Sequence, residues 1–546
     1  SGAAGSGKSC VALSSLSHYV QTLAEDKFPI LYVTESEQLA NHVRLVWQSL
    51  PIAQELNAND VQFKSYEQLI KELEPRTANM NFVGKDNCLE WLDGYIKLDK
   101  KLAKVKGNAL CDEFYADINQ MYQEFRIISG CQSFDEYKKL GQKNSLFANE
   151  KEQEWLYTAY TDYQKKLEDS SSIHAPFYNL SKHNLYKRIV VDEAQDFSHL
   201  QLRALGELAC DKQICYCEDN RQSLSDNKSK VPFIEKLFHD WGVGKNQTDL
   251  TVSYRCPAAA IIMANATAEL KAIATDYGQP EIKIPPGQAQ GSVKWFDNLE
   301  GSRLFELQQL AQSPDFAIVT AKEYKDEAKK LFNTALVFTP EEIKGLQYKH
   351  IMAYRLWVNP LFEEADKVIG EKSSIFSKKS DHRAKKNQGK EHLGPPFNAF
   401  YTACTRTTDT LYVFQEDNHK LKNIIAHLKK AIPLEQKESL ETIPLPILNP
   451  EKLNADRFEH VKVLLSQGHL EQARELYMGP LGKSAEEFEE LEREFTLPTE
   501  QDPNVEKNVN TMIDCSALAE LEGSFSEKHN NNNALQEQLN NFIWWM

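Results

Sequence analysis

The chain opens on small residues, a lysine and a serine whose spacing suits the binding of phosphate. Eight residues fit the pattern G-x-x-x-x-G-K-[ST]: Gly2, Ala3, Ala4, Gly5, Ser6, Gly7, Lys8 and Ser9. Glycines in such a loop let backbone N–H groups converge on phosphate oxygens, the lysine approaches the β- and γ-phosphates, and the hydroxyl ligates Mg²⁺. We therefore expect a nucleotide cradle in which Lys8 is also catalytic and Ser9 binds the metal. The alternative is a small-residue turn that opens a helix.

Two adjacent acids further along the chain complete the chemistry that such a loop needs. Asp192 and Glu193 follow the apolar run RIVV at 188–191. A carboxylate at the carboxyl end of a buried strand can reach a metal that faces the phosphate loop. We expect Asp192 to hold Mg²⁺ through water and Glu193 to orient or activate the attacking water as a general base. The alternative, acids that cap a helix N-terminus, is common for such clusters.

Buried strands that alternate with helices must position these groups. One set of strands is expected at 28–36, 187–197 and 212–219. A second set is expected at 315–321, 335–339, 350–356 and 410–414. This alternation predicts an α/β fold with parallel sheets, in two lobes. We place the first lobe at 1–249 and the second at 250–432.

Three segments depart from this alternation. Residues 79–182 form long helical stretches rich in Tyr, Lys and Glu, which predict a helical insertion in the first lobe. Residues 371–392 carry more Lys and Arg than acids and few apolar residues, and they predict a mobile basic loop. The region 433–546 is predicted to be mainly helical, with a helical hairpin at 456–477 and a disordered, Asn-rich tail.

Length and composition limit the class of protein. A chain of 546 residues exceeds one hydrophobic core, and 41% hydrophobic with 26% charged residues is typical of a globular protein. No apolar run reaches membrane-spanning length, and the cysteines show no paired C-x-x-C spacing, so we expect reduced thiols in an intracellular, cytoplasmic protein. The net charge of −16 means that any surface for nucleic acid must be local. Because the chain lacks an initiator Met, we expect it to begin inside a longer polypeptide.

Together with four later motifs in the same order, these residues resemble the UvrD/Rep family of superfamily 1 helicases. EDNRQS at 218–223 is similar to motif III, which implies that Gln222 contacts the γ-phosphate. LTVSYRCP at 250–257 is similar to motif IV, which implies that Tyr254 stacks on the adenine and that Arg255 contacts the γ-phosphate. The resemblance covers the first 415 residues.

The two remaining motifs lie in the expected second lobe. TPEEIKGLQY at 339–348 is similar to motif V, and Gln347 stands where the family has an acidic residue that binds the ribose. YTACTRTTDTL at 401–411 is similar to motif VI, which implies that Arg406 acts across the lobe interface as an arginine finger. The resemblance implies two recombinase-like lobes that close on ATP and Mg²⁺.

The chain departs from the family mainly where the family contacts nucleic acid. Glu35 stands where an aromatic residue is usual, Glu341 where a histidine is usual, and the segment after motif III lacks the aromatic residue that stacks bases. The stretch between Arg255 and Lys344 is also too short for the large accessory subdomain of UvrD-type helicases. Duplex separation by that subdomain is therefore not expected.

Two functions of different class remain open. The first is an ATP-dependent translocase or helicase that moves 3′ to 5′ on single-stranded DNA or RNA, with Lys64, Tyr66 and the basic loop at 371–392 as candidate contacts. The second is a helicase-derived ATPase switch read by a protein partner, through the helical insertion or the C-terminal helices. A scaffold that has lost hydrolysis is disfavoured because Lys8, Glu193 and the other motif residues are present.

Overall fold

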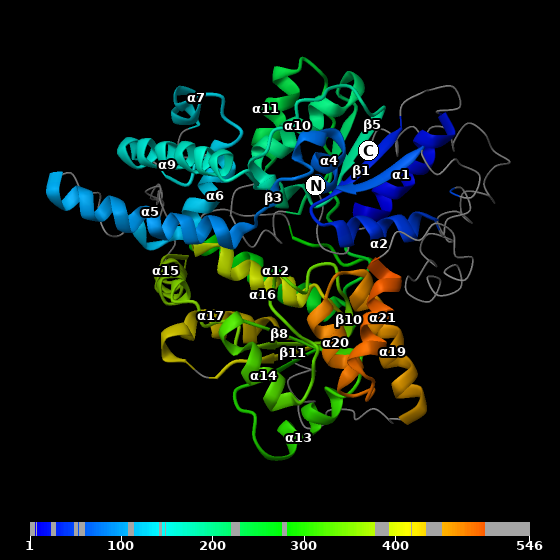
Figure 1. Cartoon of the computed structure of the whole chain (residues 1–546). Coiled ribbons are helices and arrows are strands. Elements are labelled where there is room, and N and C mark those ends of the chain that lie inside the picture. The colour runs from blue at the N-terminus through cyan, green and yellow to red at the C-terminus, as the bar shows by residue number, and fades with distance from the viewer. Residues whose placement is uncertain are drawn as a thin grey trace, which may run out of the picture.

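Two separate parallel sheets organise the chain in the computed structural model (Figure 1). The structure describes residues 6, 8–22, 29–48, 53, 60–106, 114–140, 145–147, 149–219, 230–275, 281–376, 393–416, 418–432 and 450–496. The first sheet has the order β2-β1-β5-β6 and the second has the order β7-β11-β10-β8-β9. The prediction of a mixed α/β protein with parallel sheets is therefore confirmed. No helix among the described residues is long and apolar enough to cross a bilayer.

The first sheet is covered by helices on both faces. Its strands are β1 (Ile30–Thr34), β2 (Val61–Ser65), β5 (Arg188–Val191) and β6 (Ile214–Tyr216). Its helices are α1 (Lys8–Thr22), α2 (Glu37–Gln48), α4 (Tyr66–Leu73), α10 (His199–Leu208) and α11 (Val231–Asp240). Alternate residues of β1 face opposite layers, because Ile30 and Tyr32 pack with α1 and α2 whereas Leu31 and Val33 pack with α4 and α10.

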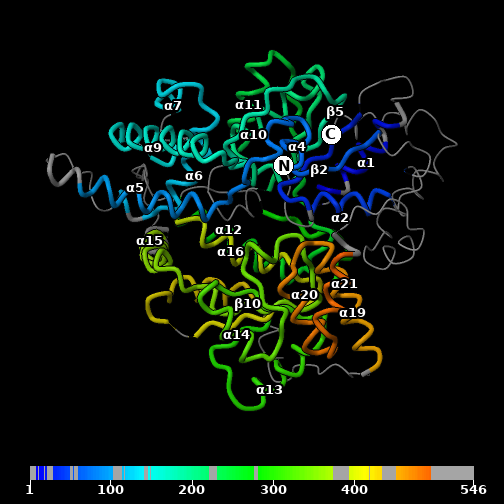
Figure 2. The backbone as a smooth tube through the Cα atoms, in the orientation of Figure 1, coloured from blue at the N-terminus to red at the C-terminus, as the bar shows by residue number. Residues whose placement is uncertain are grey.

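A helical arm lies between β2 and β5 in the chain. It contains α5 (Lys85–Lys106), α6 (Ile118–Ile128), α7 (Phe134–Lys139) and α9 (Glu150–Asp169), with β3 (Asn81–Phe82) paired to β4 (Ser172–Ile173) at its base. Its aromatic core is separate from the cores of the two sheets. In Figure 2 this arm extends to the left of the first sheet.

The second sheet is likewise sandwiched between helices. Its strands are β7 (Ser292–Phe296), β8 (Phe316–Thr320), β9 (Val337–Phe338), β10 (Tyr348–Tyr354) and β11 (Thr407–Phe414). One face packs on α12 (Ala258–Thr275), α15 (Leu361–Phe376), α16 (Pro395–Cys404) and α17 (Lys422–Ala431). The other face packs on α13 (Gly301–Leu310) and α14 (Lys325–Phe332).

Three C-terminal helices complete the described chain. They are α19 (Pro450–Ser466), α20 (Leu470–Met478) and α21 (Ala485–Thr496). Val461, Leu464 and Leu476 are buried in the same core as the second sheet, so these helices extend that sheet's packing. The predicted hairpin at 456–477 corresponds to α19 and α20, and the Asn-rich tail lies outside the described residues.

The predicted basic loop at 371–392 needs a correction at its start. Helix α15 continues to Phe376, so residues 371–376 are helical and are not loop. The apolar positions Phe362, Ala365, Val368 and Ile369 anchor the earlier turns in the second-sheet core, and Lys372 Nζ holds the extension by donating to the Ile273 carbonyl over 2.7 Å. The remainder, 377–392, lies outside the described residues.

Candidate active site

Asp192 sits at the carboxyl end of β5 and collects three hydrogen bonds. Ser9 Oγ donates to Asp192 Oδ2 over 3.0 Å, the Tyr32 hydroxyl donates to the same oxygen over 2.6 Å, and the Glu193 backbone N–H donates to Oδ1 over 3.0 Å. Burial, followed by the neighbouring charge of Glu193, raises the pKa of Asp192 above its ordinary value. A hydroxyl and a carboxylate side by side are oxygen ligands of the kind that Mg²⁺ accepts alongside water and substrate phosphates.

Glu193 has a left-handed backbone conformation, with φ 50° and ψ 45°. This region is unfavourable for a residue with a Cβ atom, so the surrounding structure must hold it there. Gln195 helps to hold Glu193 in place. Its Nε2 donates to Glu193 Oε2 over 2.5 Å, and its Oε1 accepts from the Asp219 backbone N–H over 2.9 Å. One amide side chain therefore connects the acid after β5 to the end of β6.

Lys8 begins helix α1 and faces the same acids. Its Nζ lies 3.3 Å from Asp219 Oδ2, and both side chains are largely buried. The nearby Ser6 Oγ is buried and has no hydrogen-bond partner among the described residues. A buried ammonium and an unsatisfied hydroxyl next to a helix N-terminus fit a phosphate ligand, because its oxygens would accept hydrogen bonds from both.

Two arginines approach from the second sheet. Arg255 Nη2 donates to the Thr405 carbonyl over 3.0 Å, which connects the segment before α12 to the residue next to Arg406. Gln288 Nε2 donates to the carbonyls of Tyr254, over 3.3 Å, and Cys256, over 2.8 Å, and so holds the backbone on both sides of Arg255.

Arg406 is buried, with 4% of its surface exposed. Burial and then the nearby charge of Arg255 lower the pKa of Arg406 to about 10, while the charges of Glu193 and Asp219 act in the opposite direction. Two clustered arginines that oppose two acids of the first sheet form a charged junction. The buried Arg255 Nε has no hydrogen-bond partner among the described residues, which fits an anionic ligand at this junction.

A second contact joins the two sheets beside these arginines. Lys344 Nζ, in the loop between β9 and β10, lies 3.0 Å from each carboxylate oxygen of Asp196, which follows β5. Arg126 from α6 of the helical arm donates to the Asp196 carbonyl. Part of the Glu35 residue is exposed, but its carboxyl group is surrounded by protein atoms. The resulting desolvation, and after it the charge of Asp196, raises the pKa of Glu35 to about 7.

The structure brings together six of the residues predicted for the site. They are Lys8, Ser9, Asp192, Glu193, Arg255 and Arg406. Ser6, which was also predicted, is buried two residues before Lys8. Tyr254 has 68% of its surface exposed and Gln347 is also exposed, and within the described ranges no hydrogen bond or ion pair joins either side chain to these six. The remaining predicted residues lie outside the described ones: Gly2, Ala3, Ala4, Gly5, Gly7 and Gln222.

Four contributors were missed by the sequence reasoning: Tyr32, Gln195, Asp219 and Gln288. Asp219 lies inside the quoted motif EDNRQS and Gln195 lies two residues after Glu193, so their position beside the acids was the available signal. Tyr32 lies within an apolar strand and Gln288 in a loop, so only the fold brings them to the site. One suggested contact was wrong, because Tyr66 is 1% exposed and donates to the Tyr178 carbonyl over 3.0 Å, which leaves it unable to bind nucleic acid.

Comparison with known proteins adds little to this geometry. No protein-family model and no curated protein matches the chain. Among solved structures, the arterivirus nonstructural protein 10 helicase matches with a TM-score of 0.27 and 11% identity, over 77% of this chain and 60% of that one. The same helicase in complex with DNA gives a TM-score of 0.28 and 12% identity, over 78% and 62%. The match spans less than two thirds of those proteins, and similarity this low does not assign a fold or a function.

Proposed function

We propose that this chain is an ATP hydrolase whose catalytic groups come from two sheets that close on a Mg-nucleotide. We further propose that it works as a nucleic-acid translocase or helicase of the UvrD/Rep type, with 3′ to 5′ movement on single-stranded DNA or RNA. The observation that carries the ATP hydrolase is the convergence of Lys8, Asp192 and Glu193 from the first sheet with Arg255 and Arg406 from the second. The nucleic-acid track and the direction of movement rest on the resemblance to the UvrD/Rep motifs.

The first-sheet residues have chemistry suited to phosphate transfer. Lys8 would exchange its contact with Asp219 for contacts with the β- and γ-phosphates of ATP, and Ser9 and Asp192 would hold Mg²⁺. When bound, the ion supplies positive charge to the phosphate oxygens. Glu193 accepts a proton from the water that attacks the γ-phosphorus as the bond to the leaving ADP oxygen breaks.

The second-sheet arginines match the charge that the γ-phosphate presents. Arg255 lies close enough to Arg406 to disfavour the charge of Arg406, so an anion bound between the sheets would relieve this repulsion. ATP therefore favours closure, and hydrolysis with release of phosphate favours opening. Tyr254 as the adenine platform, Gln347 at the ribose and Gln222 at the γ-phosphate complete the proposed site.

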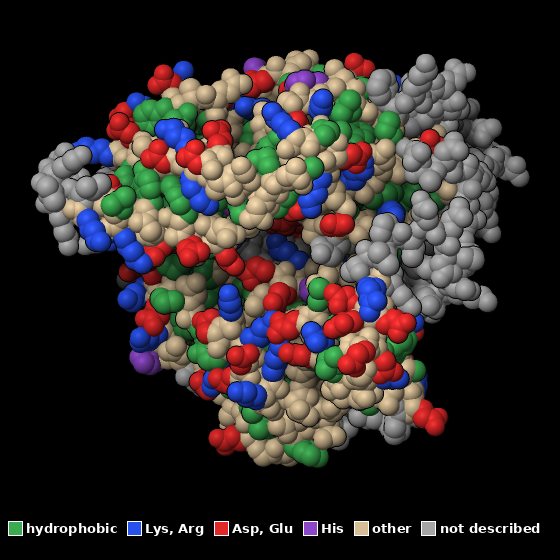
Figure 3. All heavy atoms as spheres, viewed as in Figure 1, with side chains coloured by type: hydrophobic (Ala, Val, Ile, Leu, Met, Phe, Trp, Pro, Cys, Tyr) green, Lys and Arg blue, Asp and Glu red, His purple; other side chains and the backbone are tan. Residues whose placement is uncertain are grey.

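A partner-read ATPase switch is the second candidate. On the face drawn in Figure 3, Lys and Arg side chains are interspersed with Asp and Glu and form no continuous basic stripe. The C-terminal helix α20 also exposes Leu470 and Met478, by 42% and 38%. These features favour a protein as the target of the ATPase cycle, since a nucleic-acid track is expected to meet a basic surface.

The test is the ATPase rate of the purified protein with and without single-stranded DNA or RNA, with Glu193→Gln as the blank. Stimulation by one polymer that disappears in the blank supports the translocase and identifies its track. A rate that polymers leave unchanged supports the switch. Hydrolysis by the Glu193→Gln variant at the parent rate would refute the assignment of catalysis to this site.

A further inference from the structure

The loop 339–347, between β9 and β10, is held in one shape by its own hydrogen bonds. The Thr339 backbone N–H donates to Glu342 Oε2 over 2.8 Å, and the Glu342 N–H donates to Thr339 Oγ1 over 3.3 Å. Gly345 adopts a φ of 85°, which is costly for other residues. Lys344 projects from this loop to Asp196, so the loop supplies one of the contacts between the second sheet and the first.

The hairpin α19–α20 contacts the strands at both ends of this loop. The Tyr348 hydroxyl, at the start of β10, lies 3.0 Å from His460 Nε2 of α19. The ring of Phe338, at the end of β9, meets the ring of His469 edge-on, with 5.7 Å between centroids. Burial lowers the pKa of His460 to about 4, so this imidazole is neutral at physiological pH and can accept the tyrosine's hydrogen bond.

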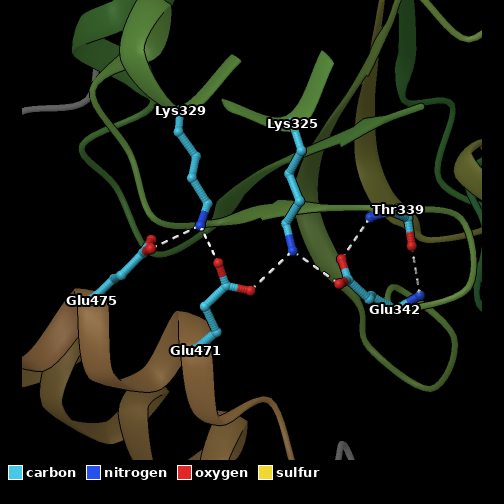
Figure 4. Close-up of polar contacts among 6 residues, drawn as sticks. All are labelled: Lys325, Lys329, Thr339, Glu342, Glu471 and Glu475. Atoms are coloured by element: carbon cyan, nitrogen blue, oxygen red, sulfur yellow. Dashed lines mark hydrogen bonds and ion pairs between the residues drawn. The ribbon is translucent and has the colours of Figure 1, made fainter. Parts of the chain in front are cut away.

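A chain of charges also links the hairpin to the loop (Figure 4). Lys325 Nζ of α14 lies 2.8 Å from Glu342 Oε1 of the loop and 3.2 Å from Glu471 Oε2 of α20. Lys329 Nζ lies 2.7 Å from Glu471 and 2.8 Å from Glu475. Glu471 therefore belongs to the chain that reaches the loop, whereas Glu475 contacts only Lys329 in this chain.

The same hairpin reaches the other sheet. Helix α19 packs against α2, which covers the first sheet, while Val461 and Leu464 are buried in the second-sheet core. One helical unit therefore touches both halves of the molecule and the loop that joins them. A unit placed in this way can influence the closure of the sheets without touching a nucleotide.

We propose that the hairpin α19–α20 positions the loop 339–347 for its contact with the first sheet. Glu471 is the positioning residue, and it acts through Lys325 on Glu342. The effect on ATP turnover rests on the proposed function, whereas the effect on the loop itself does not. The experiment therefore measures both the mobility of the loop and the rate of ATP turnover.

The first readout is amide hydrogen exchange of residues 339–348 in the full chain without nucleotide. Glu471→Gln is compared with Glu475→Gln, which removes another partly exposed acid of the same helix that also pairs with Lys329. We expect exchange about threefold faster in Glu471→Gln, as for the loss of one partly exposed ion pair, and parent-like exchange in Glu475→Gln. Equal exchange in the two variants would overturn the proposal.

The second readout is a double-mutant cycle with Lys344→Ala, measured as ATP turnover. We expect Glu471→Gln to lower kcat about threefold in the parent, with KM unchanged, and to have no further effect when Lys344 is absent. Effects that add independently would contradict a role through the loop. A parent that hydrolyses no ATP would refute the proposed function, and the exchange measurement would still decide the role of the hairpin.

Discussion

Glu193 combines a strained backbone with a side chain held by Gln195, next to the carboxylate that we assign to the metal. We expect Glu193→Gln to retain ATP binding and to lower turnover about 100-fold or more, because the amide preserves shape and removes the base. Nucleotide binding by fluorescence and single-turnover hydrolysis measure the two effects separately. Glu67→Gln, an exposed acid of α4, is the control and is expected to behave like the parent.

Tyr32, a residue of β1, is expected to strengthen the binding of Mg²⁺ at Asp192. Its hydrogen bond favours the charged form of Asp192, so Tyr32→Phe raises the pKa of Asp192 further and weakens the binding of Mg²⁺. We expect the Mg²⁺ concentration for half-maximal turnover to rise about tenfold.

Tyr66→Phe is the matched control for this prediction. It removes the buried hydroxyl of Tyr66, which donates to the Tyr178 carbonyl and makes no hydrogen bond to Asp192 or Glu193 among the described residues. Both variants should lose about 1 kcal/mol of stability, which urea unfolding measures. An equal Mg²⁺ requirement in the two variants would contradict the role of Tyr32.

The sequence was sufficient to select several residues that the fold brings together, and insufficient to select the residues that support them. Lys8, Asp192 and Arg406 were predicted from local motifs. Tyr32 was not, because an apolar strand with one tyrosine is typical of many cores, and its contact with Asp192 joins residues 160 positions apart. Contacts of this kind depend on strand order, which the sequence did not reveal.

At the scale of elements, the loop 339–347 between β9 and β10 is the connection in which we expect a substitution to affect ATP turnover. Gly345→Ala is expected to cost about 1 kcal/mol, because alanine at φ 85° is strained. Gly482→Ala, at φ 64° in the connection before α21 and with open space around it, carries a similar strain away from the junction. We expect similar losses of stability, but only Gly345→Ala should lower ATP turnover, by about tenfold, because it moves Lys344. Equal turnover in both would contradict this role.

Strands were predicted correctly where the sequence has a continuous apolar run and were missed where polar residues interrupt that run. The apolar runs at 28–36 and 350–356 predicted β1 and β10, because continuous apolar residues are typical of strands buried on both faces. Strands β2 and β7 were missed, since VQFKS and SVKWF interrupt the apolar run with Gln or Lys. The basic loop was predicted to begin too early, because the last turn of α15, SSIF, lies next to a basic stretch that dominated the local composition.

At the scale of the whole molecule, buried histidines predict sensitivity to acid. Burial lowers the pKa of His174 and of His460 to about 4. Between pH 6.5 and 4 the unfolded chain therefore binds more protons at these sites than the folded chain, and stability falls as the pH falls. Glu35 has its pKa raised to about 7, so it has the opposite effect: between pH 7 and 4.5 its contribution to stability increases as the pH falls.

We expect each histidine to cost about 1–2 kcal/mol between pH 6.5 and 5. Urea unfolding at pH 5, 6 and 7 measures this. His460→Gln should flatten the pH dependence, and Glu35→Gln should steepen it. A urea midpoint that rises as the pH falls through this window would contradict the assignment.

The central claim is that residues of two sheets act on one nucleotide, and Arg406→Ala tests it most directly. Arg406 comes from the second sheet, whereas Lys8, Asp192 and Glu193 come from the first. The measurement is single-turnover ATP hydrolysis together with ATP affinity, with Arg303→Ala of α13 as an exposed control. We predict a rate at least about 1000-fold lower in Arg406→Ala, with affinity changed less than about tenfold, and a parent-like control. A rate within about threefold of the parent would mean that Arg406 does not act on the nucleotide across the junction, and the account would be wrong on this central point.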